Sequence, residues 1–131
     1  MPASPTLRIR GFDIHKGYLD ETAQYDLIDA LRGVLKAAPL FSPTTRFGKQ
    51  MSVRMTSAGK YGWYSDPRGY RYEPRHPNGT LWPPIPDQVL SIWRDTTGLT
   101  RDPDCCLINY YGDSAKMGMH QDRDEADFTF P

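Results

Sequence analysis

The sequence reads Cys105-Cys106-Leu107-Ile108-Asn109-Tyr110-Tyr111 and then, after the turn residues Gly112-Asp113-Ser114, Lys116-Met117-Gly118-Met119-His120-Gln121-Asp122. The apolar and aromatic character of the first segment, with a turn behind it, predicts two consecutive β-strands. Residues i and i+2 of a strand project from the same face. We therefore expect Asn109 and Tyr111 to share one face, and His120 and Asp122 to share a face of the following strand.

One imidazole and one carboxylate on one face supply two ligands of the 2-His-1-carboxylate arrangement that holds Fe(II) with open positions. The third ligand is not visible. The other two histidines of the sequence are His15, which precedes the first expected helix, and His76, which sits in a proline-rich loop. A His-x-Asp triplet alone also fits a surface pair or a hydrogen-bonded core pair. An Asn and a Tyr near a metal are suitable hydrogen-bond partners for a carboxylate-bearing co-substrate.

The length and composition indicate a single domain over residues 1–131. No leader peptide or membrane-spanning apolar run is visible, so we expect a cytoplasmic protein. Cys105 and Cys106 are adjacent and are expected to be reduced, half-buried strand residues. The 16 basic and 16 acidic residues balance, but residues 46–76 carry seven basic residues against two acidic ones. This local excess suits a phosphate backbone, or is a chance segregation on a solvated surface.

Two helices are predicted before residue 105. The first runs from about Asp20, which can cap it, to Ala38, and Pro39 ends it. The second covers about residues 87–97, with Gly98 as its stop. The apolar stripe of the first helix consists of Leu27, Ile28, Leu31, Val34, Leu35 and Ala38.

The remaining patterns are those of short strands. A strand is expected at residues 7–10, and residues 46–64 suggest strands joined by Ser57-Ala58-Gly59. Ser65-Asp66-Pro67-Arg68-Gly69 predicts the turn of a β-hairpin. The expected fold class is α+β, mainly β. A sheet that ends at residue 131 would lack covering strands, so we expect the N-terminal portion of a longer protein.

Residues 105–111 and 116–125 resemble the AlkB family of DNA alkylation-repair dioxygenases. That family shows a Cys-Leu-Ile-Asn run, a tyrosine two residues after the asparagine, and His-Gln-Asp followed by Asp-Glu. The resemblance covers most of the chain from about residue 19. Segments that resemble the family's nucleotide-recognition region are Met51-Ser52-Val53-Arg54-Met55-Thr56, Gly62-Trp63, Gly69-Tyr70-Arg71-Tyr72 and Trp82-Pro83.

The resemblance implies an incomplete double-stranded β-helix, or jelly-roll, that starts within residues 105–131. N-terminal helices and a nucleotide-recognition hairpin region at about 41–82 would precede it. It also implies Fe(II), 2-oxoglutarate and O2 as cofactor and co-substrates. The implied reaction is DNA repair by oxidative demethylation of bases such as 1-methyladenine or 3-methylcytosine, with release of formaldehyde. The implied partner is alkylated DNA, preferably single-stranded, with RNA as a second option; we expect a monomer that binds no membrane.

By motif match, His120 and Asp122 would bind the iron, and Asn109 and Tyr111 would contact 2-oxoglutarate. Trp63 would stack on the flipped base, opposite the ring of His120. Stacking of a base on an aromatic ring contributes about 1–3 kcal/mol. Without the resemblance, Trp63 would be interpreted as an ordinary core residue.

Three further substrate contacts are implied. Tyr70 would lie near a DNA phosphate, and Asp124 would lie beside the edge of the base. Asp124 and Glu125 together would favour a positively charged base over a neutral one. The alternative for this acidic pair is a solvated turn.

The sequence departs from the family in one respect. The family's distal iron-binding histidine, the arginine that holds the 2-oxoglutarate carboxylate, and a second arginine near the metal lie downstream of the position of Asp122, and none can be matched here. We therefore expect the 131-residue chain alone to be inactive. Two alternatives remain: an oxygenase of the same scaffold that acts on a protein or small molecule, and a non-catalytic module that binds single-stranded or damaged nucleic acid.

Overall fold

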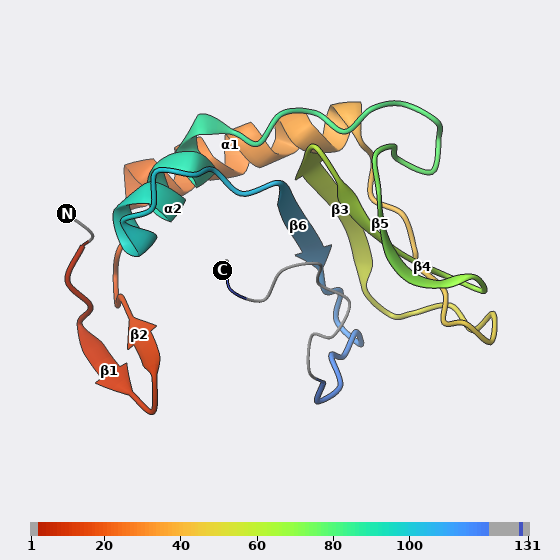
Figure 1. Ribbon diagram of the computed structural model, residues 1–131, viewed down its shortest axis with the longest axis horizontal. Helices are drawn as coiled ribbons and strands as arrows, with labels where there is room; N and C mark the ends of the chain where they lie inside the picture. The colour runs from red at the N-terminus through yellow and green to blue at the C-terminus, as the bar shows by residue number, and fades with distance from the viewer. Residues whose placement is uncertain (1–2, 121–128, 130–131) are drawn as a thin grey trace.

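The computed structural model describes residues 3–120 and residue 129. Within them lie two helices and three two-stranded antiparallel sheets, arranged as in Figure 1. The helices are α1 (Glu21–Ala37) and α2 (Asp87–Thr97). The sheets pair β1 (Leu7–Ile9) with β2 (Phe12–Ile14), β3 (Arg54–Gly59) with β6 (Cys105–Tyr110), and β4 (Gly62–Asp66) with β5 (Gly69–Glu73). Neither helix of this described part is long and apolar enough to cross a membrane.

The mixture of helices and strands confirms the α+β prediction. The expected predominance of strands is wrong for the described residues, in which helices occupy as many positions as strands. The reason is the shortness of the strands, each of which has only three to six residues.

Helix α1 begins and ends where the sequence predicts. The Asp20 carboxylate accepts a hydrogen bond from the backbone N–H of Ala23 (2.8 Å), which satisfies a donor of the first helical turn. At the other end, the Ala38 N–H donates to the carbonyl of Val34. Val34 and Ala38 of the predicted stripe are buried, whereas Ile28 is 44% exposed.

Gly33 lies in the middle of α1. A Cβ atom at this position would meet no other atom within 4 Å. Glycine in a helix interior lowers stability by about 0.8–1.0 kcal/mol relative to alanine, because a glycine residue loses more backbone freedom on folding than an alanine residue does. Gly33→Ala is therefore expected to raise the free energy of unfolding by about 1 kcal/mol, measured by urea titration. An unchanged or lowered midpoint would contradict the open surroundings of this residue.

The core lies where α1, α2 and the β3–β6 ladder meet (Figure 1). Val34 of α1, Ala58 of β3 and Ile85 before α2 are buried together. Helix α2 has the predicted bounds and ends at Gly98, which adopts a left-handed conformation (φ 68°) and donates its N–H to the carbonyl of Arg94. The partly buried residues that pack against this core are Val89, Leu90, Cys106 and Ile108.

The β3–β6 ladder runs from the pair Arg54–Tyr110 to the pair Gly59–Cys105. Strand β6 is confirmed, but the prediction that Ser57-Ala58-Gly59 joins two strands is wrong, because these residues form the second half of β3. These small residues do not form a turn; their size allows neighbouring segments to pack closely against β3. Ser57 and Ala58 are fully buried, and a Cβ on Gly59 would lie 2.4 Å from the carbonyl oxygen of Asp104.

The strand predicted at residues 7–10 is confirmed as β1, and its unpredicted partner is β2. Arg10 (φ 50°) and Gly11 (φ 85°) form the two-residue turn between them, with the positive φ angles that a tight hairpin requires. Figure 1 shows this hairpin projecting away from the helices and the other strands. The apolar residues of its two strands, Leu7, Ile9, Phe12 and Ile14, are all exposed.

The hairpin predicted around residues 65–69 is confirmed as β4 and β5. Asp66 pairs with Gly69, which has a positive φ of 102°, and the Asp66 carboxylate accepts a hydrogen bond from the Arg68 N–H at 2.9 Å. Strand β4 packs against both β3 and β6, so this hairpin lies beside the central ladder.

Candidate functional site

Strand β6 presents alternate residues to opposite sides of the ladder. Cys106 and Ile108 pack against the helical core, so Asn109, which pairs with Met55, faces the side away from the helices. The Asn109 side chain is exposed. Tyr111 lies one residue beyond the strand, and its hydroxyl donates to the sulfur of Met117 at 3.5 Å. The two predicted 2-oxoglutarate contacts therefore lie at one end of β6.

The strand predicted at residues 116–122 is wrong for residues 116–120, which form no regular structure. A strand needs a neighbouring strand to pair with its backbone groups, and β3 is the only partner of β6 in the described part of the chain. The Ser52 hydroxyl instead fixes this segment. It accepts from the Lys116 N–H (3.1 Å) and donates to the Lys116 carbonyl (3.3 Å), which holds the segment beside the start of β3.

The described geometry of His120 fits a metal ligand. Its Nδ1 atom lies 3.0 Å from the carbonyl oxygen of Gly118. A carbonyl can only accept, so Nδ1 carries the hydrogen and the acceptor lone pair of the neutral ring is on Nε2. Backbone support of this kind commonly orients histidines that bind metals through Nε2. The predicted site residues Asp122, Asp124 and Glu125 lie outside the described residues.

No described group of three His, Cys, Asp or Glu side chains is arranged to hold a metal. The other two histidines have different surroundings. His15 lies edge-on to Tyr18, with ring centroids 5.9 Å apart. His76 is buried, and both of its ring nitrogens are hydrogen-bonded: Nε2 lies 2.7 Å from the Pro39 carbonyl, and Nδ1 accepts from the Asn78 N–H at 3.0 Å.

Trp63 and Tyr70 come together on one face of the β4–β5 hairpin. Their rings stack with centroids 5.4 Å apart and an interplanar angle of 30°. Trp63 is half-buried and Tyr70 is 52% exposed. The register places Tyr70 opposite Ser65 and Trp63 opposite Tyr72, so the stacked pair is a diagonal contact across the hairpin. A continuous aromatic surface of this type can hold a flat ligand.

Arg71 organises the charges of the same hairpin. Its guanidinium donates to both carboxylate oxygens of Asp66 (2.7 and 2.9 Å), donates to Glu73, and lies over the Tyr64 ring at 5.3 Å. The hydrogen bonds from Arg71 hold the pKa of the Asp66 carboxyl well below its usual range, and the two carboxylates raise the pKa of Arg71. Burial, with the nearby charge of Glu73, raises the pKa of Tyr64 to about 12.

This network predicts a pH-dependent contribution of Asp66. The folded-state pKa lies below the unfolded value of about 3.9, so the stabilisation is complete above that value and is lost as the pH falls through the folded pKa. Asp66→Asn is expected to lower the free energy of unfolding by about 1–3 kcal/mol at pH 7, since hydrogen bonds between charged groups are lost. Thermal unfolding curves at pH 7 and in strong acid measure the difference. A deficit that persists undiminished in strong acid would refute the role of this ion pair.

An aromatic cluster that sequence reasoning missed packs against the β4–β5 hairpin. It consists of Phe41, Tyr64, His76 and Trp82. Trp82 is 5% exposed and lies 5.2 Å from the His76 ring and 6.1 Å from the Tyr64 ring. The fourth member, Phe41, lies edge-on to His76 at 5.3 Å. The indole Nε1 of Trp82 donates to the Glu73 carbonyl at 2.8 Å, which joins this cluster to β5. The spacing of these four residues in the sequence contains no period that would have identified them.

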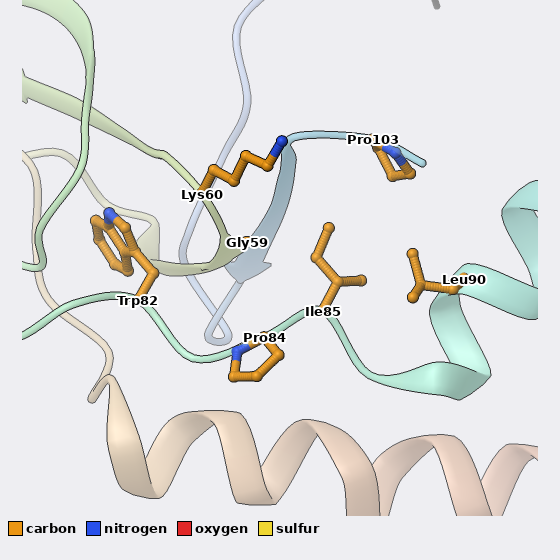
Figure 2. A pocket seen from close by; sticks show the side chains of 7 residues that line it. All are labelled: Gly59, Lys60, Trp82, Pro84, Ile85, Leu90 and Pro103. Carbon is orange, nitrogen blue, oxygen red and sulfur yellow. The ribbon is translucent and has the colours of Figure 1, made fainter. Parts of the chain in front are cut away.

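A cavity lies elsewhere in the described structure (Figure 2). It has a volume of about 380 Å³ and opens at the Gly59–Cys105 end of the ladder. Four residue steps along β3 separate this end from the Met55–Asn109 pair, or roughly 13 Å. The cavity is therefore not the predicted 2-oxoglutarate site. Its lining consists of Gly59, Lys60, Trp82, Pro84, Ile85, Leu90 and Pro103.

The sequence of the chain is similar to those of known proteins. The family model described as the 2OG-Fe(II) oxygenase superfamily matches residues 11–131. The chain is 47% identical to an alpha-ketoglutarate-dependent dioxygenase AlkB homolog of Caulobacter vibrioides, over 100% of this chain and 60% of that protein. It is 37% identical to the alpha-ketoglutarate-dependent dioxygenase AlkB of Salmonella typhimurium, over 83% of this chain and 53% of the relative.

A more distant relative has a name that states its substrate. It is the DNA N(6)-methyladenine demethylase ALKBH1C of Arabidopsis thaliana, which is 25% identical over 89% of this chain and 30% of its own length. The chain thus spans 60% or less of each of these three relatives. The resemblance to AlkB proteins inferred from the sequence motifs is confirmed by these matches.

Proposed function

The chain belongs to the 2OG-Fe(II) oxygenase superfamily, and from this membership we propose that the protein is an Fe(II)- and 2-oxoglutarate-dependent dioxygenase that removes alkyl groups from nucleic-acid bases. The observation that carries the proposal is the 47% identity to an AlkB homolog along the whole chain. The matched region includes the His120-Gln121-Asp122 block and the hairpin with the stacked pair Trp63–Tyr70.

In the proposed site, His120 supplies Nε2 and Asp122 supplies a carboxylate to the iron. Fe(II), 2-oxoglutarate and O2 together supply the oxidising power that hydroxylates an N-alkyl carbon when the metal is bound. The exposed Asn109 and Tyr111 at the end of β6 orient 2-oxoglutarate through an amide and a phenol. In this proposal a double-stranded β-helix would begin at β6, and residues 41–82 would be the nucleotide-recognition region.

The proposed substrate is DNA that carries a cationic lesion such as 1-methyladenine or 3-methylcytosine. Hydroxylation of its methyl carbon and cleavage of the C–N bond would release formaldehyde, while 2-oxoglutarate would be converted to succinate and CO2. Trp63 stacks on the extruded base, while Asp124 and Glu125 place negative charge near its edge. A base that is already unpaired costs less to extrude, which favours single-stranded DNA or RNA. We propose that the protein works as a monomer in the cytoplasm. The demethylase name of the Arabidopsis relative supports a nucleic-acid substrate.

The test uses protein expressed from the complete reading frame that contains this chain. We expect formaldehyde release from a 3-methylcytosine oligonucleotide that requires both Fe(II) and 2-oxoglutarate. Trp63→Ala is expected to lower kcat/KM for that oligonucleotide about 5- to 150-fold, which corresponds to the loss of about 1–3 kcal/mol of stacking. Substrate-free turnover of 2-oxoglutarate provides the control and should not change.

Two outcomes would contradict the proposal. Absence of 2-oxoglutarate turnover in the complete protein would remove the dioxygenase assignment. An unchanged oligonucleotide rate in Trp63→Ala would instead favour a protein or small-molecule substrate on the same scaffold, because Trp63 would then not contact the reacting group.

A further inference from the structure

Ser52 lies between two residues whose backbone is held in place. On one side, the Met51 N–H donates to the Pro43 carbonyl at 2.8 Å. On the other side, Arg54 pairs with Tyr110 at the start of β3. A group that binds the Ser52 hydroxyl is therefore attached to the β3–β6 ladder.

The Ser52 hydroxyl bonds both backbone groups of Lys116. It accepts from the Lys116 N–H at 3.1 Å and donates to the Lys116 carbonyl at 3.3 Å. A hydroxyl can do both, because it carries one donor hydrogen and two acceptor lone pairs. One side chain thus supplies the pair of hydrogen bonds that a neighbouring strand would supply, at a place where residues 116–120 form no strand.

The attachment at Lys116 limits where the His120 ring can lie. The two residues are four positions apart, and four residues of chain span at most about 14 Å. Within this short span, the carbonyl oxygen of Gly118 lies 3.0 Å from the Nδ1 atom of His120 and orients the ring. Ser52 therefore sets the place of the segment, and Gly118 sets the orientation of the imidazole within it.

Two further contacts of this segment are local in the sequence. The Ala115 N–H donates to the Gly112 carbonyl at 3.0 Å, and the Tyr111 hydroxyl donates to the sulfur of Met117 at 3.5 Å. A thioether sulfur is a weak acceptor, and neither bond reaches β3. The bonds to Ser52, by contrast, join positions 64 residues apart and hold the segment beside the start of β3.

We propose that Ser52 is a positioning residue for the iron site: through Lys116 it holds the segment that carries His120 where the histidine can bind Fe(II). This inference rests on the proposed function, which assigns the metal to His120. If the segment leaves this place, only a fraction of the molecules is ready to bind the metal, and the apparent dissociation constant rises by the inverse of that fraction. Since Ser52 belongs to residues 41–82, it also joins the proposed nucleotide-recognition region to the metal-binding segment.

The experiment compares variants of the protein expressed from the complete reading frame. Ser52→Ala should weaken Fe(II) binding about three- to tenfold, measured by competition with a chelating dye, because a neutral hydrogen bond contributes about this factor to an equilibrium. Groups that contact a metal ligand directly contribute about 10- to 100-fold. The effect of Ser52 is smaller because it acts through Lys116 and both residues are exposed to water. Ser52→Thr keeps the hydroxyl and should restore the wild-type affinity.

Hydrogen exchange of the metal-free protein provides a readout that does not depend on iron. The Lys116 amide loses its acceptor in Ser52→Ala and should exchange about three- to tenfold faster, whereas Ser52→Thr should keep the wild-type rate. The matched control is Ser114→Ala, which removes another exposed serine hydroxyl two residues before Lys116 and should change neither readout. The urea midpoint should be the same in all three variants, which separates positioning from a general loss of stability.

Wild-type Fe(II) affinity in Ser52→Ala would overturn the proposal, and so would a loss of affinity that Ser52→Thr does not restore. His120→Ala shows which of the two proposals has failed. If His120→Ala loses Fe(II) affinity while Ser52→Ala keeps it, the role of Ser52 is refuted and the proposed function stands. If neither substitution changes the Fe(II) affinity, the assignment of the metal to His120 fails as well.

Discussion

Gly62→Ala is expected to destabilise the protein by about 3 kcal/mol, at the upper end of the usual cost of overpacking. Gly62 is buried, and a Cβ at this position would lie 2.2 Å from two carbon atoms of the Trp82 six-membered ring. The indole cannot easily retreat, because its Nε1 is hydrogen-bonded to the Glu73 carbonyl and its ring packs against His76 and Tyr64. Small domains are stable by only about 5–15 kcal/mol, so this loss is large. Urea unfolding monitored by tryptophan fluorescence measures it.

Trp82→Phe tests whether the clash with the indole causes this destabilisation. Of the three Trp82 atoms that the added methyl group would strike, Cζ2 and Cη2 belong to the part of the indole that phenylalanine lacks. In a Trp82→Phe background, Gly62→Ala should therefore cost less than about 1 kcal/mol, which gives a coupling energy of about 2 kcal/mol in the double-mutant cycle. Gly33→Ala, with open space around its Cβ, is the matched control for the glycine-to-alanine change itself. Additive effects of the two substitutions would show that Gly62 is constrained by something other than the indole.

His120→Ala is expected to produce the largest functional effect. Residues that merely orient metal ligands contribute about 10- to 100-fold to metal affinity or activity. Loss of a ligand should exceed this, so we expect 2-oxoglutarate turnover by the protein from the complete reading frame to fall by more than about 100-fold. The Fe(II) affinity, measured by competition with a chelating dye, should fall with it. This second readout separates a lost metal from a lost substrate contact.

His15→Ala is the control for this experiment, because His15 lies against Tyr18 in front of α1 and far along the chain from the predicted ligands. It should retain both metal affinity and turnover. Wild-type Fe(II) affinity in His120→Ala would show that the Nε2 atom of His120 is not a ligand, however well its Nδ1 hydrogen bond fits one.

The elements that could be predicted from the sequence are those determined by neighbouring residues. The Asp20 cap, the Gly98 stop and the Asp66–Gly69 turn each act within a few residues, and each is found in the structure. Ser57-Ala58-Gly59 was misinterpreted because small residues have the same composition in a turn and in a tightly packed strand. What distinguishes them is the approach of Asp104, which lies 45 residues away from Gly59 along the chain.

The same limit applies to the candidate site. The types of residue at 109, 111 and 120 predict their chemistry, but the path of residues 116–120 depends on which strands are available to pair with them. Their attachment to Ser52 could not be read from the local pattern, since it joins positions 64 residues apart. The aromatic cluster around Trp82 was missed for a similar reason: its members come from three separate segments and meet only in the folded chain.

The β3–β6 ladder has a consequence for the order in which the protein forms during translation. Its paired residues are separated by 46 to 56 positions, from Gly59–Cys105 to Arg54–Tyr110. At about 5–20 residues per second, a ribosome needs several seconds to deliver β6 after β3 has been made. The β4–β5 hairpin, whose strands are consecutive, can close within that interval. The nascent chain therefore exposes the β3 edge that β6 later covers for several seconds. During this period a chaperone can bind that edge.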